Sequence, residues 1–245
     1  MLNLHGFTSN LVQQAAYSRV PRLGAERGYV VVTPQGTGLV PRWSFPRLPG
    51  PDDAGFLRSV IDDVGATLAV DPRRIYSTGI SNGAAMTMAL ADLWPGYFAA
   101  VAPVAGINAI PARPVAGVPV CAFHGTDDRI VPYRGSTLFA GLRPGGDALR
   151  RRPGPRFALP AVEGVLAEYA RANGVTADPV VTQVGSDVRH LLYATTPRLE
   201  LFSVQGGGHT WPGSFDAVRL LGATSRTIDA TSVMLDRFDA GTVPG

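Results

Sequence analysis

A serine stands between two glycines in Gly79-Ile80-Ser81-Asn82-Gly83, and this stretch constrains the fold more than any other part of the chain. The run Ile75-Tyr76-Ser77-Thr78 precedes it, and an apolar, alanine-rich run from Ala84 to Leu93 follows it. A G-x-S-x-G sequence between a strand and a helix is typical of a strained turn that exposes the serine hydroxyl above a sheet. The stretch therefore predicts a strand, a tight turn and a helix, with Ser81 as a nucleophile.

The rest of the chain alternates short apolar runs with stretches of helical spacing. Apolar or β-branched runs predict strands over residues 1–4, 29–33, 75–78, 99–104, 118–123, 180–184, 188–194 and 199–204. Helical spacing and capping residues predict helices over residues 10–27, 53–68, 84–93, 161–172 and 224–238, with Asp53 as one cap. This alternation predicts a single α/β domain over residues 1–245, a doubly wound, mostly parallel sheet with an irregular insertion at about 133–160.

The amino-acid composition excludes several classes of function for this chain. All 22 basic residues are arginines, scattered along the chain, and the formal charge is only +3, so no nucleic-acid partner is expected. The absence of lysine excludes P-loop phosphate binding and lysine-based catalysis. A single cysteine, Cys121, excludes intrachain disulfides and cysteine-rich metal sites, and no apolar run reaches membrane-spanning length. We expect neither a metal nor a cofactor.

Residues with catalytic side chains follow three of the predicted strands. Ser81 follows one strand, Asp127 and Asp128 follow a second, and His209 follows a third. The carboxyl ends of parallel strands share one edge of a sheet, and the chain order Ser, Asp, His is that of α/β hydrolases. Either aspartate can serve as the acid, since both stand in the same turn.

The chain has only four histidines, and each has a distinct setting. His5 and His124 stand in His-Gly turns, where hydrogen bonds to the loop backbone are expected. His190 alternates with Val188 and Leu192, which predicts a solvent-facing position on a hairpin strand. His209 follows three glycines, whose freedom lets the backbone turn an imidazole toward Ser81, so His209 is the expected base.

Ester chemistry at Ser81 also needs donors for a developing oxyanion. The backbone N–H groups of Asn82, just after the nucleophile, and of Phe7, after His5-Gly6, are the expected pair, and the Thr8 hydroxyl is a further candidate. Trp43 and Trp211 stand in loops at strand ends, which favours an exposed aromatic groove for a polymer or an aromatic acyl group.

Several motifs together resemble one known family. They are Leu4-His5-Gly6, the stretch from Asp71 to Gly83, the stretch His124-Gly125-Thr126-Asp127-Asp128-Arg129-Ile130-Val131-Pro132-Tyr133, the stretch Gly206 to Gly213, and Thr224 to Thr231. With these motifs the chain resembles the polyhydroxybutyrate depolymerase and feruloyl and acetylxylan esterase group of α/β hydrolases, from Met1 to about Phe238. The resemblance implies that Asp128 is the acid, Ser81 the nucleophile and His209 the base. Phe7 and Val175 stand where many members have cysteine, so the disulfides of those members are not expected.

The resemblance implies a serine carboxylester hydrolase that forms an acyl-enzyme on polyhydroxyalkanoate-type or other short-chain esters, polymeric or small. A feruloyl or acetylxylan esterase acting on plant polysaccharide is the alternative within enzymes, and a non-catalytic hydrolase-fold binding protein is the alternative from another class. Secretion is also implied, although Met1 is followed almost at once by an expected core strand, so we expect no signal peptide within this sequence.

Compared with the family, the chain begins inside the third strand of the usual sheet. The predicted strand Tyr29 to Thr33 then lies at an edge, and it has no charge, proline or bulge to protect that edge. We therefore expect self-association through Tyr29 to Thr33, or marginal solubility, and a longer natural product that supplies the absent strands.

Overall fold

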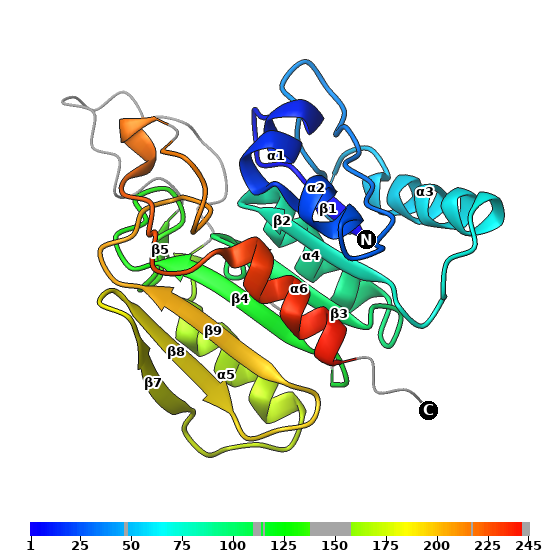
Figure 1. The fold of residues 1–245 in the computed structure, drawn as a ribbon. Helices are drawn as coiled ribbons and strands as arrows, with labels where there is room; N and C mark the ends of the chain where they lie inside the picture. The colour runs from blue at the N-terminus through cyan, green and yellow to red at the C-terminus, as the bar shows by residue number, and fades with distance from the viewer. Residues whose placement is uncertain (47–48, 110–113, 115, 138–157, 217, 242–245) are drawn as a thin grey trace.

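The computed structural model describes residues 1–46, 49–109, 114, 116–137, 158–216 and 218–241 (Figure 1). Its main sheet has seven strands in the order β1-β2-β3-β4-β9-β8-β7. Parallel pairing joins β1 (Leu2–Leu4), β2 (Tyr76–Ile80), β3 (Ala100–Val104), β4 (Val120–Gly125) and β9 (Leu199–Val204). The hairpin of β7 (Val180–Val184) and β8 (Val188–Tyr193) adds antiparallel strands beside β9. The predicted mostly parallel α/β sheet is confirmed.

Helices cover both faces of this sheet. One face carries α3 (Asp53–Thr67), α4 (Asn82–Leu93) and α5 (Val162–Ala172), and the other carries α1 (Leu11–Ser18), α2 (Val20–Ala25) and α6 (Ala230–Ala240). In Figure 1, α6 lies in front of the sheet, and α4 and α5 lie behind it. Side chains along a strand alternate between the two cores, as Val120 and Ala122 do with Cys121 and Phe123. Both faces of the central strands are therefore buried.

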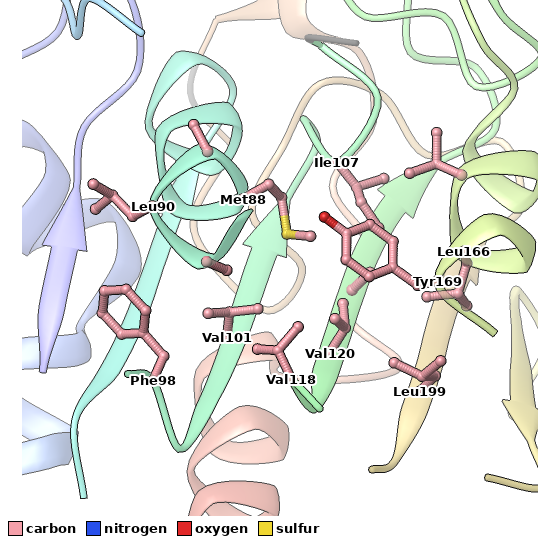
Figure 2. Close-up of a cluster of buried hydrophobic side chains, with 14 of the residues drawn as sticks. Met88, Leu90, Phe98, Val101, Ile107, Val118, Val120, Leu166, Tyr169 and Leu199 are labelled. Carbon is pink, nitrogen blue, oxygen red and sulfur yellow. The ribbon is translucent and has the colours of Figure 1, made fainter. Parts of the chain in front are cut away.

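The core behind the sheet fixes the helix that follows Ser81. Figure 2 shows Met88 of α4 pointing toward Tyr169 of α5, with Val101 and Val120 of the sheet below them. The Tyr169 hydroxyl donates a hydrogen bond of 2.6 Å to Asp92 Oδ1, which joins α5 to α4. Each fully buried Leu or Met side chain contributes about 1.5–3 kcal/mol. The turn at Ser81 therefore rests on an anchored helix.

The starts of α3 and α6 differ from the prediction, α3 in its capping residue and α6 in its first residue. Asp52, and not Asp53, caps α3, because Asp52 Oδ1 accepts the Gly55 N–H at 2.9 Å. Asp53 is buried, and its Oδ2 accepts the Ser44 N–H at 2.7 Å. The last helix begins at Ala230 rather than Thr224, with Asp229 as its cap.

The predicted helix over residues 10–27 is divided into α1 and α2. Arg19 separates them with a left-handed backbone, at φ 58°. Most of the predicted insertion, residues 138–157, lies outside the described residues. Its ends form a small antiparallel pair of β5 (Ser136–Thr137) and β6 (Ala158–Leu159).

The predicted strand Tyr29 to Thr33 is reduced to a single parallel bridge between Val32 and Leu2, held by backbone hydrogen bonds from Asn3 N to Val32 O and from Val32 N to Met1 O, each 2.9 Å. The bridge places this segment outside β1, on the side away from β2. A groove lined by Val30, Val32, Ile61 and other residues runs between the segment and α3. The segment therefore lies at the expected edge, although it is shorter than expected.

Candidate active site

Ser81 lies at the sharp turn between β2 and α4 and has a left-handed backbone, with φ 58° and ψ −118°. A non-glycine residue is strained in this region. The two flanking glycines permit the turn: a Cβ on Gly79 would lie 2.6 Å from the Leu4 carbonyl oxygen, and one on Gly83 would lie closer still. The Ser81 N–H donates to Val104 O at 2.9 Å, which ties the turn to the end of β3. This is the strand, turn and helix that the G-x-S-x-G stretch predicts.

Asp128 lies in the turn after β4 and is 5% exposed. Its Oδ1 accepts the backbone N–H groups of Ile130 and Val131, each at 2.8 Å. Its Oδ2 lies 2.7 Å from His209 Nδ1 and 3.2 Å from His124 Nε2. Burial alone raises the pKa of this carboxyl, but the hydrogen bonds from the two imidazoles outweigh burial and hold its pKa well below the usual range. Asp128 is therefore a carboxylate.

Asp127, the other aspartate of this turn, is exposed. The structure thus pairs Asp128 with His209, as the family resemblance implies.

His209 follows Gly206-Gly207-Gly208 and is 6% exposed. Its backbone N–H donates to Leu221 O at 2.6 Å, and a Cβ on Gly208 would overlap that same carbonyl. The loop also packs on α1, since the Trp211 N–H donates to the Tyr17 hydroxyl at 3.2 Å and Ser214 Oγ donates to Tyr17 O at 2.6 Å. With Nδ1 bonded to Asp128, Nε2 is the ring nitrogen left for proton transfer.

The three side chains share one edge of the sheet. Backbone hydrogen bonds run from Ala105 N to Phe123 O and from Thr126 N to Val204 O, so β3, β4 and β9 end level with one another. Ser81 and Asp128 follow strands separated by β3, a span of about 10 Å that an imidazole from β9 can partly bridge. No hydrogen bond joins Ser81 Oγ to His209 Nε2 within the described residues, and in unliganded sites this contact is often long and tightens with substrate.

The segment after β1 lies against the serine. A Cβ on Gly6 would lie 3.4 Å from Ser81 Cβ, so the Phe7 N–H follows directly beside the nucleophile. Thr8 has a left-handed backbone, at φ 67°, and its N–H donates to Pro41 O at 2.9 Å. The N–H of Asn82 is in the first turn of α4, where helical N–H groups lack an intrahelical partner.

His5 holds this segment, a role that the His-Gly motif indicated only in general terms. Its Nε2 accepts the Gly36 N–H at 2.9 Å, and its Nδ1 donates to Gly6 O at 2.8 Å. Burial lowers the pKa of His5, although the bond to Gly6 opposes that effect. His5 is therefore a neutral strut between the loop after β1 and the following loop.

The expectation that Trp43 and Trp211 line an exposed groove is wrong. Trp43 is 1% exposed and its Nε1 donates to His5 O at 3.0 Å, while Asn82 Oδ1 accepts the Trp43 backbone N–H at 2.7 Å. Trp211 is fully buried, and its Nε1 donates to Thr231 Oγ1 at 3.0 Å. Both rings face the interior and pack the loops that carry the site, because a position in a loop does not fix the direction of a side chain.

Sequence reasoning missed the exposed apolar side chains of the surrounding loops. Those in the segments around Phe7, before Pro41 and after Ser214 are Phe7, Leu39, Val40, Phe215, Val218 and Leu220. Phe215 contacts the ring of Tyr17, with centroids 5.2 Å apart. Phe7 and Leu39 each follow a glycine, which was the signal available for those two residues; the sequence carries no comparable signal for the others.

His190 was expected to face solvent, and this expectation is also wrong. Its side chain is only 13% exposed, its Nε2 lies 2.7 Å from Glu200 Oε2, and its ring stacks on Phe202. Within the described residues no three side chains of His, Cys, Asp and Glu gather where a metal ion can bind. None of the described helices has the length and apolar character needed to cross a membrane.

No protein-family model matches the chain. NocK of Nocardia uniformis subsp. tsuyamanensis, to which an esterase activity is ascribed, is 32% identical over 77% of this chain and 58% of its own length. Poly(3-hydroxyalkanoate) depolymerase C of Paucimonas lemoignei and feruloyl esterase B of Piromyces equi are each 26% identical over 85% of this chain. The chain spans 54% and 39% of those two relatives.

Solved structures agree on the fold. Acetyl xylan esterase from Aspergillus awamori superposes with a TM-score of 0.62 at 14% identity, covering 85% of this chain and 82% of its own. SOBER1 from Arabidopsis thaliana superposes with a TM-score of 0.54 at 17% identity, covering 98% of this chain and 97% of its own. The chain thus has the α/β-hydrolase fold and is a sequence relative of the polyhydroxyalkanoate depolymerase and feruloyl and acetylxylan esterase group.

Proposed function

We propose that the protein is a serine carboxylester hydrolase that works through an acyl-enzyme at Ser81. The observation that carries this proposal is the joint placement of Ser81 and the buried Asp128–His209 pair. Ser81 is strained at the end of β2, and the pair, joined at 2.7 Å, lies at the same sheet edge. A nucleophile, a base and a group that orients the base form the arrangement that acyl transfer requires.

Each residue has one role in the proposed reaction. Ser81 Oγ attacks the ester carbonyl carbon while His209 Nε2 takes its proton, and the carbonyl electron pair moves onto oxygen. The N–H groups of Phe7 and Asn82 bind this oxyanion, and Asp128 stabilises the imidazolium. Collapse expels the alcohol, which takes the proton from His209, and water then releases the acid by the same route.

The proposed substrates are polyhydroxyalkanoate-type or other short-chain esters. Two observations support them: one relative is named a poly(3-hydroxyalkanoate) depolymerase, and the side chains of Phe7, Leu39, Val40 and Phe215 are exposed on loops of the catalytic edge. Apolar side chains suit the methylene and methyl groups of an aliphatic acyl chain. A feruloyl or acetylxylan esterase is the second candidate, favoured by the names of two other relatives.

The decisive experiment is labelling with a fluorophosphonate probe, followed by peptide mapping of the adduct. We expect one adduct at Ser81, lost in Ser81→Ala and kept in Ser59→Ala, whose serine is on the exposed face of α3. Hydrolysis of p-nitrophenyl butyrate should follow the same pattern. Hydrolysis that survives Ser81→Ala overturns the mechanism, and a folded wild type without label or turnover is a binding protein.

Four substrates then separate the candidates: p-nitrophenyl butyrate, poly(3-hydroxybutyrate) granules, methyl ferulate and acetylxylan. We expect turnover of the first two. Higher kcat/KM on methyl ferulate or acetylxylan than on either aliphatic ester would assign the second candidate instead.

A further inference from the structure

His124 is a buried histidine at the catalytic edge to which the proposed reaction gives no role. It lies in β4, it is 1% exposed, and its Nε2 is 2.9 Å from Val131 O and 3.2 Å from Asp128 Oδ2. Both neighbours are acceptors, so Nε2 carries the hydrogen and shares it between them. Nδ1 has no hydrogen-bond partner within the described residues, so a hydrogen there would be a buried donor without an acceptor. The geometry therefore favours the neutral Nε2–H tautomer.

Together with its other donors, His124 completes the surroundings of Asp128. Oδ1 accepts the N–H groups of Ile130 and Val131, and Oδ2 lies 2.7 Å from His209 Nδ1 and 3.2 Å from His124 Nε2. A carboxylate has about four lone-pair sites, so these donors account for all of them. Without His124, Oδ2 has His209 as its only donor, and nothing else fixes the carboxylate on that side.

We propose that His124 is a positioning residue for the catalytic pair, and that its Nε2–H holds Asp128 Oδ2 in line with His209 Nδ1. This inference rests on the proposed function. His124 does not touch substrate and transfers no proton. It fixes the direction of the carboxylate and takes up part of its negative charge, so the strength of the Asp128–His209 bond depends on it.

The sign of the effect follows from that charge. Loss of the His124 donor leaves a more concentrated charge on Asp128, which stabilises the protonated imidazole of His209. More of the base is then protonated at a given pH, so the acidic limb of the kcat/KM profile moves to higher pH. Poorer alignment of the His209 imidazole lowers kcat and has little effect on KM, because the hydrogen bond between Asp128 and His209 strengthens in the transition state.

Within the described residues, three titratable groups lie around His124. They are Asp128, His209, which contacts the same Asp128 Oδ2, and Tyr133, whose ring meets the imidazole edge-on with centroids 5.8 Å apart. Burial raises the pKa of Tyr133, so this phenol stays neutral across an ordinary activity profile. On the neighbouring strand β9, the residue opposite His124 is Ser203, which does not titrate there.

The test compares two substitutions that differ in one donor. His124→Phe keeps a ring against Tyr133 and removes the N–H, while His124→Gln places an amide N–H near the position of Nε2. For His124→Phe we expect kcat to fall about 10- to 100-fold and the acidic limb to move up by about half to one pH unit. KM should stay within about twofold, and His124→Gln should recover most of kcat, since the substrate contacts are unchanged. His190→Phe is the matched control, because it removes a buried histidine that contacts Glu200 rather than the catalytic pair.

A folded His124→Phe with unchanged kcat and an unchanged acidic limb overturns the proposal. An acidic limb of the kcat/KM profile that moves equally in His190→Phe also overturns the proposal.

A second measurement applies if the His124→Phe variant does not fold. Long-range ¹H–¹⁵N correlations of the wild-type histidines report the tautomer directly. We expect His124 to carry its hydrogen on Nε2, and an Nδ1–H tautomer overturns the proposal. A folded wild type that hydrolyses none of the four substrates defeats the proposed function instead, and the tautomer then decides this inference alone.

Discussion

Replacement of Glu200 by glutamine should remove a large electrostatic contribution to the stability of the protein. Glu200 is on β9, its side chain is 1% exposed, and its oxygens contact three cationic or titratable groups: His190 at 2.7 Å, Arg237 at 2.8 Å and Arg198 at 3.1 Å. Burial raises the pKa of this carboxyl, but the hydrogen bonds from His190 and Arg198 and the charge of Arg237 lower it from 4.5 to about 2. This depression corresponds to about 3 kcal/mol, at 1.36 kcal/mol per unit.

The pH dependence of that contribution has a definite sign. Because the pKa in the folded state lies below the unfolded value, the stabilisation is fully present above about pH 4.5 and is lost as pH falls toward 2. Glu200→Gln lacks the titrating group and leaves Arg237, whose side chain is 33% exposed, without its carboxylate partner. The difference in the free energy of unfolding between wild type and Glu200→Gln should be about 3 kcal/mol at pH 7 and about 1 kcal/mol at pH 3.

Urea denaturation followed by far-ultraviolet circular dichroism at pH 7, 5, 4 and 3 measures this difference. Glu26→Gln is the control, since the Arg22–Glu26 pair is exposed, and it should cost less than about 0.5 kcal/mol at every pH. A difference for Glu200→Gln that stays constant from pH 7 to pH 3 would refute the reasoning, because a packing defect does not titrate.

Three further outcomes follow from the structure. Gly83→Ala should abolish hydrolysis and soluble expression together, since its Cβ would overlap the carbonyl of β1, whereas Gly65→Ala in α3, with its nearest neighbour at 3.9 Å, should leave both intact. Trp211→Phe should lower stability by about 1–3 kcal/mol in thermal unfolding and reduce activity uniformly on small and polymeric esters; a selective loss on the polymer would restore a substrate contact for this ring. Val30→Lys should reduce self-association measured by light scattering at equal concentration, if the edge at Tyr29 to Thr33 mediates it, because Val30 lines the groove beside this segment whereas Val31 packs on the core; a wild type that is monomeric at all concentrations contradicts that expectation.

The sequence predicted those features that depend on local chemistry. The turn at Ser81 follows from its two glycines, and the strand ends follow from the apolar runs, so the edge on which Ser81, Asp128 and His209 meet could be placed from the sequence. The acid could not be chosen between Asp127 and Asp128 from the residues alone, because both occupy one turn and only the folded turn shows which side chain points inward.

Side-chain direction in loops and the burial of charges were beyond such reasoning. Trp43 and Trp211 point inward because the path of each loop turns them there, and that path depends on bonds to distant residues such as Thr231. Glu200 alternates with Leu199 and Leu201, yet both faces of β9 are covered by helices, and its partner Arg237 comes from α6. No window of neighbouring residues contains that information.

The packing of α1 against the loop that carries His209 has a consequence for biosynthesis. Tyr17 holds Trp211 and Ser214, and Ser18 O accepts a hydrogen bond from Thr231 Oγ1 at 2.5 Å, so partners about 200 residues apart along the chain meet at the base. Contacts of such long sequence separation form late in folding. On the ribosome, the strands that precede Ser81 and Asp128 emerge well before the segment that carries His209. Under the proposed function, a nascent chain therefore stays without esterase chemistry until its last helix has left the exit tunnel, and hydrolytic activity reports completion of the fold.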